Sequence, residues 1–287
     1  MTSDGMSRGR GLTFLATGIV IVSIYLFPVY WMVITSIKSM SAIFAYPPQF
    51  FPSAPTLDAY REAVFENDIV RTAIRNSAII AVGTMLLTLV LAAPAAYALA
   101  RLRLPGGVVV LLLLLIAQLL PAIVIATPLF VLFSQLESSF PALNLISSYQ
   151  GLIIADTTAT LPFAVIVLRP FFLAIPRELE AAAMVDGDTR FGAFRRIVLP
   201  LVRPGLVTVA VFSFLMAWGE FVFALSLNND QNRQPITVAM NAFIGQYGTE
   251  WNNIMAVATT VAVPIIVVFA ALQRFIVSGI TAGATKE

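Results

Sequence analysis

Long apolar runs alternate with short polar segments along the chain, and six of these runs are long enough to cross a bilayer. A transmembrane helix needs about 20 consecutive, mostly apolar residues. Backbone N–H and C=O groups find no water in hydrocarbon, so each run is expected to be helical. The pattern therefore predicts an all-α integral membrane protein with six transmembrane helices, at residues 13–36, 76–100, 108–135, 149–169, 203–225 and 251–273.

Prolines mark the places where these helices are expected to bend or break. The charge-free run at residues 104–136 is 33 residues long, more than one span requires. Pro121 and Pro128 lie inside it, so the third span is predicted to be tilted or broken there. The polar stretch before the second span is predicted to contain one short helix, residues 57–66.

The first apolar run could be mistaken for a secretory signal, but a retained span fits it better. Residues 11–37 carry no charge over 27 positions, which is longer than the apolar centre of a signal peptide. The chain is therefore interpreted as a polar tail, residues 1–10, followed by one transmembrane domain, residues 11–287.

A polar island, residues 175–204, separates the fourth and fifth spans. Pro176 suits the first position of a helix, and Glu178 and Glu180 suit its positively polarised first turn. The alanines that follow favour a helix. Gly187 then indicates a helix end, because glycine readily adopts the left-handed conformation found there.

A second short helix is expected after this glycine. Asp188 or Thr189 can cap it, and Pro200 is expected to end it. Apolar residues recur in it at three- to four-residue spacing: Phe191, Phe194, Ile197 and Val198. The island is thus predicted to be a helix-turn-helix outside the bilayer. The alternative is a solvated loop that only joins two spans.

Composition limits the chemistry open to this chain. Charged residues make up 11% of it, whereas soluble domains carry roughly 25%. The chain has no histidine and no cysteine, which removes thiol catalysis, histidine bases and most transition-metal sites. It has no phosphate-binding loop with Gly-Lys-Ser/Thr. We therefore expect no catalytic, cofactor or metal site, no nucleic-acid partner at a net charge of +2, and a lipid bilayer as surroundings.

The distribution of basic residues orients the spans. Six spans place both termini on one side, and cytoplasmic loops carry the excess of Lys and Arg. With the termini inside, twelve of the seventeen basic residues are cytoplasmic. Both termini and the polar island are therefore predicted to face the cytoplasm.

Within the island, Asp186-Gly187 is followed at a fixed distance by Ile197-Val198-Leu199-Pro200. This spacing resembles the EAA loop of permease subunits in binding-protein-dependent ABC importers. The family's glutamate falls on Ala181, one position after Glu180, which is a departure from the pattern. The resemblance implies a type I importer permease fold whose cytoplasmic helix-turn-helix coupling loop, residues 175–202, lies between spans four and five. It implies ATPase-coupling roles for Glu180, Ala181, Ala182, Ala183, Val185, Asp186, Gly187, Arg190 and Phe194.

The same resemblance implies partners. These are a second homologous permease, a dimer of cytoplasmic ATP-binding subunits and an extracytoplasmic solute-binding protein. ATP and Mg²⁺ are expected on the ATPase subunits, with no cofactor on this chain. The expected location is a bacterial or archaeal plasma membrane.

Three further segments resemble the carbohydrate-type members of that family. They are residues 96–101, Trp218-Gly219-Glu220-Phe221, and residues 279–284, the last resembling the tail of the maltose-type second permease. The resemblance implies a sugar or polyol as cargo. It makes Trp218, Glu220 and Phe221 candidates for the substrate path, and Gly279, Thr281 and Gly283 candidates for a C-terminal ATPase contact.

Other interpretations stay open for the acids and for the whole chain. Glu220 either faces an internal cavity or is a partly hydrated acid near the interface, and Asp156 is expected just inside the outer interface. An ion-driven secondary transporter would normally hold several charged groups near the midplane. A membrane scaffold without a transport role is the other alternative.

Overall fold

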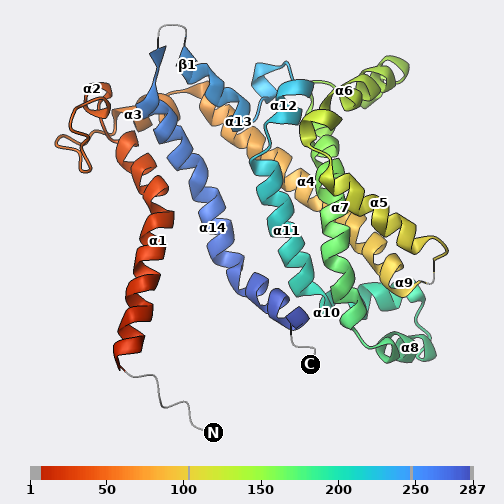
Figure 1. Cartoon of the computed structure of the whole chain (residues 1–287). Helices are drawn as coiled ribbons and strands as arrows, with labels where there is room; N and C mark the ends of the chain where they lie inside the picture. Colours follow the sequence, from red (N-terminus) through yellow and green to blue (C-terminus); the bar gives the residue numbers. More distant parts are fainter. Residues whose placement is uncertain (1–7, 103, 246–247, 285–287) are drawn as a thin grey trace. The chain divides into compact units, whose positions relative to one another are not determined.

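The computed structural model describes residues 8–102, 104–245 and 248–284, without the side chains of residues 8–12, 242, 245, 248 and 272–284 (Figure 1). The chain divides into two compact units, and each is described by itself. Unit 1 comprises Met1–Asp68 and Ala242–Ala262, and unit 2 comprises Ile69–Asn241 and Val263–Glu287.

Unit 1 contains one long apolar helix and the polar segment that follows it. Helix α1 runs over Arg8–Ser36. The predicted helix at residues 57–66 is present as α3, Asp58–Tyr60, continued by a π-helical turn, Arg61–Phe65. The unit also holds the short helix α2, Met40–Ile43, the antiparallel pair β1, Ile244–Gly245, and β2, Gly248–Thr249, and the start of α14, Trp251–Ala284.

A buried lysine organises the segment that follows α1. Lys38 is only 2% exposed, its ammonium donates to the carbonyl of Gln49, and it lies 4.7 Å from the centre of the Trp31 ring. The hydroxyl of Tyr30 donates to the carbonyl of Phe50 at 2.5 Å. The aromatic end of α1 is thereby tied to the loop after α2, and the buried ammonium has a carbonyl and an aromatic ring as partners in place of water.

Unit 2 contains the remaining helices. They are α4, Asp68–Arg101, α5, Gly107–Leu119, α6, Ala122–Ser139, α7, Tyr149–Ala174, α8, Arg177–Val185, α9, Arg190–Ala193, α10, Leu199–Leu201, α11, Arg203–Trp218, α12, Val222–Leu227, and α13, Ile236–Ala239. Five helical segments in the described part of the chain are long and apolar enough to cross a membrane, and α11 raises this to six when the bent segment before it is included.

The helices differ from the predicted spans mainly at their ends. The third run breaks at Leu120, because Pro121 precedes α6, while Pro128 lies within α6 without breaking it. Helix α11 ends at Trp218 rather than near residue 225, and α14 continues well past residue 273 to Ala284. Hydropathy shows how far an apolar run extends. It does not show where the backbone hydrogen bonds of the helix stop, so the predicted ends are less accurate than the predicted helices.

Helix α7 lies at the centre of unit 2 and packs against α5, α6, α11 and α12. Against α4 it packs closely: a Cβ on Gly83 would fall 2.4 Å from Cδ1 of Ile153. The hydroxyls of Thr88 and Thr160 hydrogen-bond at 2.7 Å in the buried interface. Small residues and paired hydroxyls are what membrane helices use to approach one another.

This packing predicts the effect of enlarging a small residue. Ala164 on α7 is fully buried, so Ala164→Leu should lower the stability of the purified protein by about 1–3 kcal/mol through overpacking. The midpoint of thermal unfolding in detergent measures this. Val90→Leu on α4, where Val90 is 68% exposed, is the matched control and should leave the midpoint unchanged. Equal midpoints for the two variants would contradict the packing described here.

Candidate functional site

The polar island forms the predicted helix-turn-helix, and its first helix ends in a Schellman motif. Helix α8 has Glu178 and Glu180 in its first turn, as the sequence suggests. Gly187 follows it with a φ of 90°. The amide of Gly187 donates to the carbonyl of Met184 at 3.2 Å, and the amide of Asp188 donates to the carbonyl of Ala183 at 2.9 Å. Glycine suits this position because a side chain strains a left-handed backbone.

The second half of the island begins at Thr189, one of the two predicted caps. Its hydroxyl accepts a hydrogen bond from the amide of Gly192 at 3.0 Å. Asp188 instead pairs with Arg196 at 3.3 Å. Helical backbone continues through a π turn, Phe194–Val198, into α10, Leu199–Leu201, so it ends one residue after Pro200, close to the predicted end.

An aromatic cluster connects the island to the membrane helices. The ring of Tyr97, near the end of α4, lies 4.7 Å from that of Phe194 and 5.8 Å from that of Phe172 on α7, between centroids. All three side chains are buried and belong to one hydrophobic core with Val198 and Val202. The island is therefore packed onto the ends of α4 and α7, which is not expected of a loop that only joins two spans.

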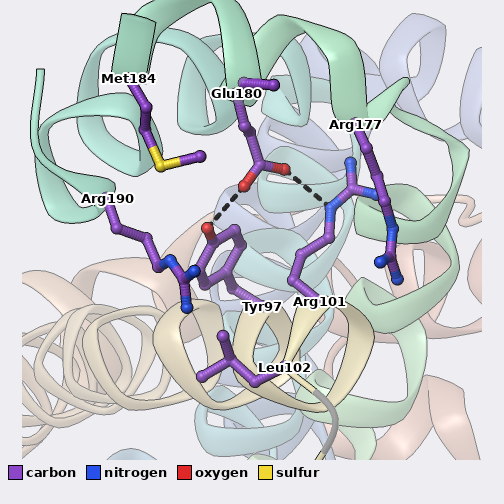
Figure 2. A pocket seen from close by; sticks show the side chains of 8 residues that line it. Tyr97, Arg101, Leu102, Arg177, Glu180, Met184 and Arg190 are labelled. Carbon is purple, nitrogen blue, oxygen red and sulfur yellow. Dashed lines mark hydrogen bonds and ion pairs between the residues drawn. The ribbon is translucent and has the colours of Figure 1, made fainter. Parts of the chain in front are cut away.

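Glu180 points into the molecule from α8 (Figure 2). Its Oε2 accepts a hydrogen bond from the hydroxyl of Tyr97 at 2.6 Å, and its Oε1 lies 2.8 Å from Nε of Arg101 in an ion pair. Arg177 and Arg190 line the same pocket, which has a volume of about 230 Å³. Sequence reasoning missed Tyr97 and Arg101 as site residues, although an arginine directly after a charge-free span was a usable signal.

The outer face of α8 is small and apolar. Val185 is 87% exposed, and Ala181 and Ala182 are exposed as well. Phe191 is 71% exposed on the neighbouring α9. Exposed apolar side chains on a segment outside the spans are typical of a surface that another protein covers.

The predicted coupling residues thus divide between two faces. Ala183 and Phe194 are buried and Glu180 turns inward, so these three position the loop. The exposed ones are Ala181, Ala182, Val185, Asp186, Gly187 and Arg190. For Gly279, Thr281 and Gly283 the backbone belongs to α14, and their side chains lie outside the described residues.

The proposed substrate-path residues lie at the break between α11 and α12. Trp218 is buried and its ring stacks on Phe214, with centroids 5.4 Å apart. Glu220 is outside both helices, and its carboxylate accepts hydrogen bonds from the amides of Phe223 at 2.8 Å and Ala224 at 3.0 Å. It therefore caps α12, and it borders a small cavity together with Asp156. Phe221 is half-buried beside it.

Asp156 is buried among protein side chains. It is 3% exposed on α7, and its Oδ1 has no hydrogen-bond partner among the described residues.

A membrane protein built almost entirely of helices, with a packed helix-turn-helix between two spans, has the architecture of a transporter subunit, and the comparisons agree. Residues 89–282 match the family described as binding-protein-dependent transport system inner membrane component. The chain belongs to this family and is the permease subunit of an ABC importer. The predicted fold is confirmed: a bacterial ABC transporter involved in alginate import superimposes with a TM-score of 0.78 at 20% identity, over 95% of this chain and 99% of that one.

Curated relatives align along nearly the whole chain. The sulfoquinovosyl glycerol transport system permease protein SmoH of Agrobacterium fabrum is 36% identical over 99% of this chain and 98% of its own length. The diacetylchitobiose uptake system permease protein DasC of Streptomyces coelicolor is 37% identical over 94% and 95%, respectively.

The cap on α12 predicts how substitutions of Glu220 rank. Glu220→Ala removes both acceptors and should lower stability by about 1 kcal/mol, whereas Glu220→Gln keeps one acceptor oxygen and should cost less. Thermal unfolding of the purified protein measures both. Glu62→Ala, at an exposed position on the π turn of unit 1, is the control and should have no effect. A Gln variant no more stable than the Ala variant would contradict the capping role.

Proposed function

We propose that this chain forms, with a second related permease, the membrane path of an ATP-driven importer for a carbohydrate or polyol. The proposed cargo class rests on the solutes named for the relatives that align along nearly the whole chain. They name sulfoquinovosyl glycerol, diacetylchitobiose and, for SugB of Mycobacterium tuberculosis, trehalose, each a sugar or sugar derivative. An extracytoplasmic binding protein delivers the solute, in line with the family's description.

The helix-turn-helix faces the cytoplasm and docks on a dimer of ATP-binding subunits, which bind ATP and Mg²⁺. The excess of basic residues on that side supports this orientation. The exposed apolar face at Val185 and Phe191 supports docking, since apolar side chains exposed together outside the bilayer are typical of a surface that another protein covers. Gly279, Thr281 and Gly283 are proposed as a second contact with the ATPase subunits.

Reconstitution tests the cargo class and the energy source together. The importer complex in liposomes, with its binding protein, should accumulate the sugar found on that binding protein only when ATP is supplied. Mass spectrometry of the purified binding protein identifies that ligand. Uptake that follows an ion gradient without ATP would overturn the proposal, and so would a binding protein loaded with an amino acid or a metal.

Docking through the apolar face at Val185 and Phe191 predicts the effect of introducing one charged side chain there. Val185→Glu places a carboxylate in an apolar contact and should weaken the attachment of the ATPase subunits by about 2 kcal/mol or more. Copurification of these subunits with the tagged permease measures the loss. Leu143→Glu makes the same change at an exposed leucine in the loop before α7, and copurification should survive it. If the Val185 variant retains its ATPase subunits, docking through this face is excluded.

A further inference from the structure

Helix α8 is attached to the rest of unit 2 mainly through polar contacts. Among its nine residues, all of them described, only Ala183 is buried. A single methyl group offers little apolar area, so burial alone holds this helix weakly. The contacts made by Glu180 and by Ile175, two residues before the helix, must therefore set its position.

Those contacts come from two residues one turn apart at the end of α4. Tyr97 hydrogen-bonds to Glu180, and Arg101 is ion-paired with it (Figure 2). Nη2 of Arg101 also donates to the carbonyl of Ile175 at 2.5 Å, two residues before α8 begins. Arg101 thus holds α8 both at its start and in its first turn.

The ion pair is shielded from water. The side chains of Arg101 and Glu180 are 6% and 12% exposed. Water and salt screen such a pair far less than a surface pair, and removing one partner leaves the other charge buried without compensation. The pair is therefore screened less by water than the exposed pair of Arg196 with Asp188.

Helix α4 carries this connection to the opposite end of unit 2. At a rise of about 1.5 Å per residue, Asn76 lies roughly 38 Å from Arg101 along the helix axis. The side chain of Asn76 donates to the carbonyls of Asn232 and Gln234 at 2.9 and 3.0 Å, and accepts from the hydroxyl of Tyr149 at 2.7 Å. One continuous helix thus connects α8 to the loop that precedes α13.

We propose that Tyr97, Arg101 and Glu180 form a clamp that makes α8 and α4 move as one body. Any displacement of α8 is then passed along α4 to the segment around Asn232. The clamp consists of positioning residues, and this inference rests on the proposed docking of α8 to an ATPase. Two distant sites are coupled when both influence the position of one shared element, and we assign that role to α4.

Uptake per ATP hydrolysed tests the clamp in the intact importer in liposomes. Glu180→Gln and Arg101→Gln should each lower this ratio by roughly fivefold or more. Because the two groups act as a unit, the double variant should be no worse than either single one. Tyr97→Phe removes one hydrogen bond, keeps the packed ring, and should give a smaller reduction.

The ATPase activity and the subunit composition separate coupling from assembly. ATP hydrolysis should stay within about twofold of the unaltered importer, with the ATPase subunits still copurifying. Glu178→Gln is the matched control, because Glu178 is on the same helix, exposed, and without an ion pair to any residue in the described ranges. Its uptake per ATP should be unchanged.

Each outcome decides one of the two proposals. If the unaltered importer shows no ATP-driven uptake, the proposed function fails. If the unaltered importer transports, three results would overturn the clamp and leave the proposed function standing. The Glu180 and Arg101 variants could keep the normal uptake per ATP, or the double variant could be worse than either single one. The variants could also lose their ATPase subunits.

Discussion

The ion pair between Arg101 and Glu180 lies where apolar membrane helices end and a charged loop begins. A short helix at such a boundary can be held by apolar burial or by polar contacts. Its alanines leave α8 little to bury, so the polar contacts carry the attachment. They can do so because the two side chains are almost fully shielded, and charges attract more strongly where water is excluded.

The sequence predicts the helices well and their ends less well. Charge-free runs predict helices because an apolar span in hydrocarbon must satisfy its backbone internally. Gly219 and Glu220 hardly change the mean hydropathy of residues 203–225, yet the helix ends there, because the Glu220 carboxylate binds the free amides of α12. Pro121 and Pro128 look alike in sequence, but only Pro121 follows a break. Local composition does not contain this difference.

The candidate site shows the same division between local and distant contacts. The helix end at Gly187 and the cap at Thr189 depend on hydrogen bonds within five residues, so the sequence contains them. The partners of Glu180 are about eighty positions earlier in the chain, on another span. Which face of α8 turns inward depends on what it packs against, and no spacing rule within residues 177–185 supplies that.

The one-residue offset between Glu180 and Ala181 has a geometric meaning. Successive residues of an α-helix differ by about 100° in direction. Glu180 faces Tyr97 and Arg101, whereas Ala181 is exposed. Ala181 also lines the pocket that contains this pair, so an acid at position 181 would lie beside the pair and not within it. The two positions are therefore not interchangeable: the acid at 180 pairs with α4 and fixes the rotation of α8 on it, and the small residue at 181 leaves the pocket beside that pair open.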